Sequence, residues 1–149
     1  MDEFARERCF GDFEGLPEVL NALRTVEEAV SDRDYLTWRP PNGESVVDLR
    51  NRILEFLQLV QKEAMKLPIV SPTILVASHG AFMEELYYIL ANSRYGQTIP
   101  NHLWSRGKPG YQNTGVAKYT FSTNLIENDT NILEEVECHI FSCASHLAN

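Results

Sequence analysis

The candidate chemistry begins at Ser78-His79-Gly80, where a histidine follows an apolar run and precedes a helical pattern. Residues 73–78 (TILVAS) have the composition of a buried strand, and apolar residues return at helical spacing from Ala81. In open α/β sheets, ligands gather at the carboxyl ends of the strands. The free N–H groups and the dipole of a helix N-terminus favour an anion there, and Gly80 lets a ligand approach the backbone closely. This placement of His79 predicts phosphoryl or carboxylate chemistry. Taken alone, a histidine that only caps or packs against the helix is an equal alternative.

A second candidate is Glu7, which lies between Arg6 and Arg8 in the stretch RERCFGDFEG. Two neighbouring guanidinium groups can bind anionic oxygens or favour the ionised form of the acid between them. Arginine also presents a planar fork that suits phosphate. A solvated charged loop explains the same residues and is favoured when this stretch is considered alone. Glu14 is a weaker candidate, because the glycines on either side of it indicate turns.

The stretch PPNGES, residues 40–45, has a sufficient structural explanation. Asn42-Gly43 is a turn signal and Ser45 is a helix cap, so Glu44 receives only low weight as a site residue. The remaining histidines, His102, His139 and His146, have no metal-ligand spacing, and no Cys/His cluster is present. The sequence has neither a Gly-x-Ser-x-Gly motif nor a phosphate-binding loop that ends in Gly-Lys-Ser/Thr. A metal site, a serine hydrolase and a P-loop enzyme are therefore poorly supported.

Two helices are predicted before the histidine. The first begins near Pro17 and ends at WRPPNGE, where prolines and Asn-Gly cannot continue it. Its apolar residues at helical spacing are Val19, Leu20, Leu23, Val26 and Val30. The second begins at Ser45, with Asp48 in its first turn, and ends before Pro68. Its predicted apolar face consists of Val46, Val47, Ile53, Leu57, Val60 and Ala64.

The predicted strand 73–78 and a helix at about residues 81–91 come next. Two alternating segments end the chain, and the polar run between them favours an antiparallel pair. Their predicted inward faces are Ala117, Tyr119 and Phe121 in one, and Val136, Cys138 and Ile140 in the other. The predicted class is α/β, with helices on a sheet whose central strand is 73–78. Only three or four strands are visible, which is few for a doubly wound sheet.

Length and composition limit the functions that this protein can have. Its 149 residues correspond to one domain. With 44% apolar and 23% charged residues, the composition is typical of a globular protein. The net charge of -8 argues against nucleic acid and requires any anion site to be local. No run approaches the roughly 20 apolar residues of a membrane span, and the charged N-terminus lacks a signal-peptide core. Three cysteines without metal or redox spacing favour reduced thiols in a cytoplasmic protein.

Four motifs resemble those of the histidine phosphatase (phosphoglycerate mutase-like) superfamily and occur in the same order as in that superfamily. They are ERCFGDFEG, PPNGES, ASHGAFMEEL and NTGVAKYTF. The resemblance covers roughly residues 6–121 and is closest to the TIGAR-type fructose-2,6-bisphosphatases. It implies a three-layer α/β/α fold and a reaction through a phosphohistidine. His79 matches the second histidine, which stabilises the phosphoryl oxygens, and Glu7 matches the acid that protonates the leaving oxygen. Arg8 and Gly80 would contact the substrate phosphate. The resemblance implies neither a metal nor an organic cofactor.

The chain departs from this family at one point. The family's nucleophile lies in an Arg-His-Gly motif, which these 149 residues do not contain. The expectation is therefore an N-terminally truncated member, a single partial domain over residues 1–149. Its expected function is that of a phosphatase for a sugar bisphosphate such as fructose-2,6-bisphosphate, which would regulate glycolysis. The alternative is an inactive remnant that binds a protein partner or a phosphorylated ligand. An exposed sheet edge would favour self-association.

Overall fold

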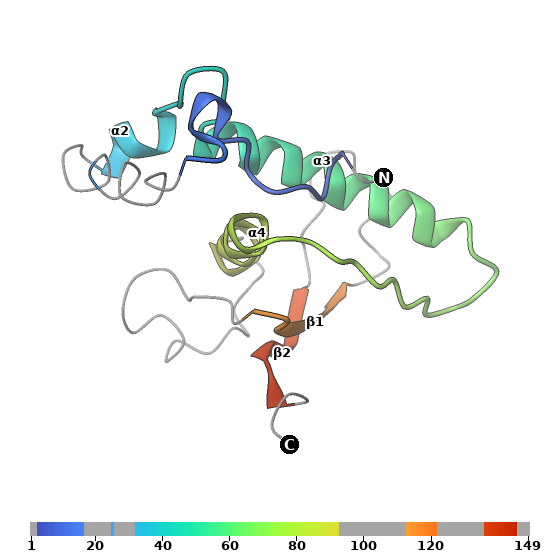
Figure 1. The fold of residues 1–149 in the computed structure, drawn as a ribbon. Helices are drawn as coiled ribbons and strands as arrows, with labels where there is room; N and C mark the ends of the chain where they lie inside the picture. The colour runs from blue at the N-terminus through green and yellow to red at the C-terminus, as the bar shows by residue number, and fades with distance from the viewer. Residues whose placement is uncertain (1–2, 17–24, 26–31, 93–112, 122–135, 146–149) are drawn as a thin grey trace. The chain divides into compact units, whose positions relative to one another are not determined.

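The computed structural model describes residues 3–16, 25, 32–92, 113–121 and 136–145 (Figure 1). The chain divides into two compact units, Met1–Ala77 and Ser78–Asn149. The first unit contains the short 3-10 helix η1 (Gly11–Phe13), α2 (Asp32–Thr37) and α3 (Val46–Met65). The second contains α4 (Gly80–Asn92) and the strands β1 (Val116–Phe121) and β2 (Val136–Cys143). Helices and a small sheet are therefore both present, as the predicted α/β class requires.

Helix α3 begins where the sequence predicts, because a reciprocal capping box fixes its first turn. The Ser45 hydroxyl accepts a hydrogen bond from the Asp48 N–H at 3.1 Å, and the Asp48 carboxylate accepts one from the Ser45 N–H at 2.8 Å. Two of the N–H groups that a helix start leaves unsatisfied are thereby paired. The helix ends at Met65, before Pro68, which confirms the predicted boundary.

The buried face of α3 differs in part from the predicted one. Its buried residues are Val46, Leu49, Ile53, Phe56 and Leu57. Val47 is 38% exposed, so its predicted place on this face is wrong. Val47 is one position, and therefore about 100°, from Val46 on a helix with 3.6 residues per turn. Leu49 and Phe56 occupy the stripe instead, at the helical spacing that continues from Val46.

The helix predicted from Pro17 to WRPPNGE lies in part outside the described residues, and within it the structure describes Thr25 and residues 32–37, which are helical. Helix α2 falls in the last part of this prediction and ends at Thr37, so the predicted break at WRPPNGE is confirmed. Helix α2 packs against α3. The Trp38 ring, just after α2, lies 6.3 Å from the Phe13 ring of η1, centroid to centroid. These contacts bring the loop after α2 to the loop that contains Glu7 within the first unit.

The central strand predicted at residues 73–78 is wrong. Residues 72–79 have no regular secondary structure, and the Leu75 side chain is 96% exposed. An apolar run becomes a strand only when a neighbour pairs with its N–H and C=O groups. Within the described part of the chain, the only sheet pairs β1 with β2. Residues 73–78 therefore have the composition of a strand, but no described segment pairs with them.

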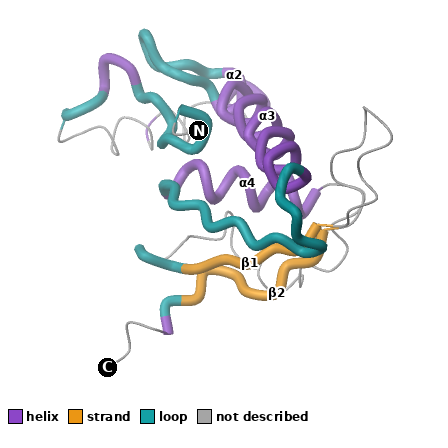
Figure 2. The backbone as a smooth tube through the Cα atoms, turned by 90° about the vertical axis from the view of Figure 1, so that its right-hand side faces the viewer, coloured by secondary structure: helices purple, strands orange, loops and turns teal. Residues whose placement is uncertain are grey.

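The antiparallel pair at the end of the chain is confirmed, with an irregular register (Figure 2). Tyr119 lies opposite Cys138, whereas Lys118 lies opposite Ile140, so His139 is an extra residue on β2. Opposite residues share a face of the sheet, and an extra residue moves the next residues of its strand to the other face. Ile140 therefore lies on the exposed face with Lys118 and is 39% exposed, which corrects its predicted inward direction. Phe121, also predicted inward, is 37% exposed.

Helix α4 spans Gly80–Asn92 and confirms the helix predicted near residues 81–91. Its buried apolar residues are Phe82, Leu86, Tyr87 and Leu90. The Tyr87 ring packs at 4.3 Å from the Phe141 ring of β2, centroid to centroid, in a tilted arrangement. Burial, and to a lesser extent Cys138, raises the pKa of Tyr87. Among the described helices, none is both long enough and apolar enough to cross a membrane.

Candidate functional site

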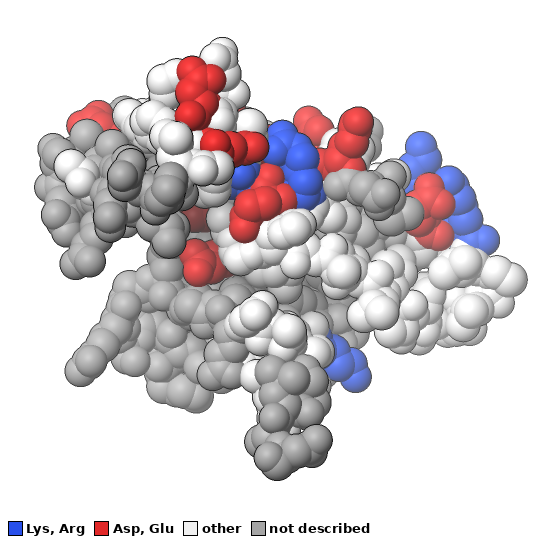
Figure 3. Space-filling model, viewed as in Figure 1, with Lys and Arg blue, Asp and Glu red and all other residues white. Residues whose placement is uncertain are grey.

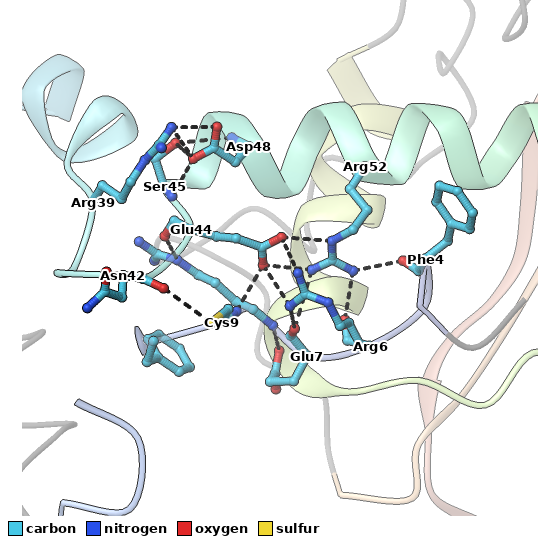
Figure 4. Close-up of polar contacts among 12 residues, drawn as sticks. Phe4, Arg6, Glu7, Cys9, Arg39, Asn42, Glu44, Ser45, Asp48 and Arg52 are labelled. Carbon is cyan, nitrogen blue, oxygen red and sulfur yellow. Dashed lines mark hydrogen bonds and ion pairs between the residues drawn. The ribbon is translucent and has the colours of Figure 1, made fainter. Parts of the chain in front are cut away.

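The charged cluster in the first unit is centred on the carboxylate of Glu44, in the loop before α3 (Figure 4). Five N–H groups donate to its two oxygens. Arg6 donates through both terminal nitrogens, at 3.1 and 2.7 Å, and Arg52 donates through Nε and Nη2, at 3.0 and 2.9 Å. The Cys9 backbone N–H donates at 2.9 Å. Two bidentate guanidinium contacts and a backbone bond use all of the roughly four acceptor sites of one carboxylate.

Arg52, two turns into α3, connects this carboxylate to the N-terminal segment. Its Nη1 donates to the carbonyl oxygens of Phe4 at 2.8 Å and Arg6 at 3.0 Å, and its Nη2 donates to that of Glu7 at 3.3 Å. The Arg52 side chain is 11% exposed and the Glu44 side chain 16% exposed. The pair is therefore largely removed from water, where its interactions are screened less than at the surface.

The loop after Glu7 and the loop before α3 also meet backbone to backbone. The Glu44 N–H donates to the Cys9 carbonyl at 2.8 Å, and the Asp12 N–H donates to the Pro41 carbonyl at 3.0 Å. Gly11 has a φ of +55°, and a Cβ there would lie 2.0 Å from the Pro41 carbonyl oxygen. Only glycine permits this approach, because it both tolerates the left-handed conformation and lacks the Cβ.

Glu7 and Arg8 are adjacent in the chain, but their side chains are buried to different extents. The Glu7 side chain is half-buried, and one of its oxygens accepts a hydrogen bond from the Arg8 N–H at 2.9 Å. Arg8 is only 5% exposed. Its Nε donates to the Glu44 carbonyl at 2.9 Å, and its guanidinium carbon lies 5.4 Å from the centre of the Phe10 ring. Its Nη2 is buried without a hydrogen-bond partner among the described residues.

Glu44 is the residue whose role the sequence pattern underestimates. Arg6 is predicted to flank Glu7 electrostatically, but its guanidinium group pairs with Glu44. The acid and its two arginines are separated by 38 residues on one side and 8 on the other. Neither separation has a periodic signal that links the three residues. An acid directly before a helix cap, two turns from an arginine, is the only local hint.

The electrostatics of the cluster result from these contacts. Burial alone would raise the pKa of the Glu44 carboxyl, but the hydrogen bonds from Arg52 and Cys9, with the charges of Arg52 and Arg6, lower it below its ordinary value. The Asp48 pKa is also lowered, first by the Ser45 hydroxyl. The central blue patch in Figure 3 lies directly against red side chains. Within this unit, Arg6 and Arg52 share the Glu44 carboxylate and Arg39 pairs with Asp48.

His79 directly precedes α4, as predicted, and its carbonyl oxygen accepts the Met83 N–H at 3.0 Å. His79 and Gly80 are both exposed. The chain before them is not a strand, so His79 lies at a helix start and not at a strand end. Glu7 belongs to the first unit and His79 to the second. Their meeting at one phosphate therefore stays a prediction.

The other candidate groups are the remaining histidines and the cysteines. His102 and His146 lie outside the described residues, and His139 contacts Thr120 at 2.6 Å on the exposed hairpin. Cys9, Cys138 and Cys143 are free thiols. Hydrogen bonds to Ser145 lower the pKa of the Cys143 thiol, whereas burial raises that of Cys138. In the described part of the chain, no three His, Cys, Asp or Glu side chains are grouped as metal ligands.

Comparison with known families gives the context of this cluster. Residues 1–123 match the Histidine phosphatase superfamily (branch 1). The chain belongs to the histidine phosphatase superfamily. This match confirms the resemblance at the level of the superfamily, together with the α/β class, and it includes Glu7, Arg8, Glu44, Arg52 and His79.

One similar superfamily member is a 2,3-bisphosphoglycerate-dependent phosphoglycerate mutase from Gloeothece citriformis (strain PCC 7424). It is 30% identical to this chain over 105 residues. The aligned region covers 69% of this chain and 43% of the mutase. The chain thus spans less than half the length of this relative.

Proposed function

We propose that these residues form the acid- and phosphate-binding part of a histidine phosphatase site that acts on a small phosphorylated substrate. The observation that carries the proposal is the adjacency of the Glu7 carboxylate, which accepts the Arg8 backbone N–H, and the buried Arg8 side chain. The half-buried Glu7 carboxylate lies beside Arg8, which is only 5% exposed and keeps one guanidinium nitrogen without a partner in the described residues. A buried donor without an acceptor costs about 1–3 kcal/mol, more when it is charged. A phosphate oxygen would satisfy it.

The residues then have distinct roles. Arg8 would bind and orient a phosphate oxygen, and Glu7 would protonate the leaving oxygen and later activate water. His79, at the N-terminus of α4, would stabilise the charge on the transferred phosphoryl group, with Gly80 allowing its close approach. The phosphohistidine would form on an Arg-His-Gly motif that the 149 residues do not contain. We therefore expect this chain alone to be inactive.

The proposed substrate is a sugar bisphosphate such as fructose-2,6-bisphosphate, as in TIGAR-type enzymes, with a role in regulating glycolysis. The similar mutase from Gloeothece citriformis makes phosphoglycerates a second substrate class to test. A cytoplasmic location and self-association through a sheet edge stay predictions.

The test compares the 149-residue chain with a version extended upstream to include an Arg-His-Gly motif. Phosphate release from fructose-2,6-bisphosphate and mutase activity on 3-phosphoglycerate are measured for both, together with acid-labile phosphoenzyme. The extended version should be active. Glu7→Gln should lower its kcat by about 10²–10⁴-fold, as expected for loss of a general acid. His79→Ala should lower it by about 10²–10³-fold, as for loss of an oxyanion-stabilising donor.

The outcomes separate the alternatives. Activity only in the extended version supports the proposal, and the preferred substrate decides between the phosphatase and the mutase. Full activity of the extended Glu7→Gln variant would exclude Glu7 as the acid. Turnover by the 149-residue chain that disappears in His79→Ala would show that no further nucleophile is needed. An inactive extended version that still binds phosphate would favour the non-catalytic alternative.

A further inference from the structure

The Glu44 carboxylate is poorly suited to acid–base or ligand chemistry of its own. Five N–H groups already donate to it, and its pKa is lowered. An acid held ionised by two guanidinium groups and a backbone N–H has little capacity to give up or accept a proton near neutral pH. Its partners, however, all lie in or contact the segment that contains Glu7 and Arg8. Its function must therefore be sought in the segment that it holds.

Glu44 holds this segment through every polar group it has. Its carboxylate accepts the Cys9 N–H, its N–H donates to the Cys9 carbonyl, and its own carbonyl accepts Arg8 Nε. Arg52, which is paired with Glu44, holds the carbonyls of Phe4, Arg6 and Glu7. Figure 4 shows these bonds converging on the extended segment from α3 and from the loop before it. The backbone on both sides of Glu7 is thus fixed without any contact to the Glu7 carboxylate.

We propose that Glu44 and Arg52 are positioning residues that present Glu7 and Arg8 together to an anion. This inference rests on the proposed function of that pair. The Glu44 carboxylate, which already accepts five N–H groups, would not itself bind the phosphate. Its contribution is to keep the Arg8 guanidinium and the Glu7 carboxylate in one geometry, which reduces the ordering required on binding.

The experiment uses the 149-residue chain and inorganic phosphate, monitored by two-dimensional NMR. The Arg8 N–H donates to Glu7 and not to Glu44, so its resonance reports the orientation of the Glu7 carboxylate indirectly. Glu44→Gln keeps the shape of the side chain and removes its charge. Arg52→Lys keeps the charge and removes the planar fork, and therefore provides a second test if Glu44→Gln fails to fold. Asp48→Asn is the control, because it weakens the cap of α3 without touching the Phe4–Cys9 segment.

In Glu44→Gln and Arg52→Lys, we expect faster amide exchange of Cys9, by about tenfold or more, as for loss of a charged hydrogen bond. The Arg8 N–H should move toward its unstructured chemical shift, and the dissociation constant for phosphate should rise about tenfold. Asp48→Asn should leave the Arg8 chemical shift and the dissociation constant for phosphate unchanged. Its Cys9 amide should exchange no faster than its overall loss of stability explains.

Unaltered Arg8 and Cys9 amides in both variants would overturn the inference, as would equal changes in Asp48→Asn. Phosphate binding that is measurable in the parent chain and equally strong in both variants would overturn the positioning role while leaving the proposed function intact. If the parent chain binds no phosphate but the amides change as expected, the positioning holds and the proposed binding by Arg8 fails.

Discussion

Replacing Gly11 with alanine should separate the two loops that carry the candidate site. Gly11 has a φ of +55°, and a Cβ would lie 2.0 Å from the Pro41 carbonyl oxygen and 2.6 Å from the Gly43 nitrogen. Both neighbours are backbone atoms, so neither can move away by a change of rotamer. The loops must therefore shift apart, and the hydrogen bonds Asp12 N–H to Pro41 and Glu44 N–H to Cys9 are the first to lengthen.

The magnitude is the sum of a conformational cost and the lost hydrogen bonds. A left-handed conformation costs a non-glycine residue about 1–2 kcal/mol, and each lost hydrogen bond costs about 1 kcal/mol. Gly11→Ala should therefore lower the free energy of unfolding by about 3–4 kcal/mol. Gly15→Ala is the matched control, because Gly15 also has a positive φ, +77°, but a Cβ there would have nothing within 4 Å. It should show only the conformational cost, about 1–2 kcal/mol.

Urea unfolding of the two variants measures the difference. Trp38 contacts Phe13 in the affected region, so tryptophan fluorescence reports the separation of the loops. Phosphate binding by the folded Gly11→Ala chain should weaken as well, since Arg8 is held by Glu44 across the same loops. If the two variants are destabilised equally, within about 0.5 kcal/mol, the close approach at Gly11 does not exist in solution and the loop geometry is wrong.

Three further predictions concern α3 and its cap. Ser45→Ala removes the capping oxygen and should cost about 1 kcal/mol in urea unfolding, and an unchanged midpoint would contradict the capping box. Leu49→Ala should cost about 2–5 kcal/mol because Leu49 is fully buried, whereas Val47→Ala should change stability by less than about 1 kcal/mol; equal losses would contradict the assigned face. The pKa values of Glu44 and Asp48 are lowered on folding, so their contribution to stability is present above about pH 4.5 and is lost as the pH falls through the lowered values. Glu44→Gln should flatten the loss of stability in acid, and an unchanged pH profile would exclude Glu44 as a linked group.

Local features of the sequence determined α3, α4 and the antiparallel pair of β1 and β2. Ser45 and Asp48 fix the start of α3 within four residues of chain, and the break before Pro68 needs no distant partner. The alternation around Tyr119 and Cys138 predicted two strands, and the polar run between them predicted their antiparallel pairing. The four motifs also identified the superfamily, because their order over most of the chain is specific even though each is modest alone.

Tertiary structure alone decided the surroundings of the candidate site. Glu44 and Arg6 are 38 residues apart, and their contact depends on how two loops fold back on each other, which no local propensity encodes. The bulge at His139 turned Ile140 to the exposed face, since the direction of a strand side chain depends on its register with the neighbouring strand. Residues 73–78 show the same limit, because a strand exists only with a partner to accept and donate its hydrogen bonds.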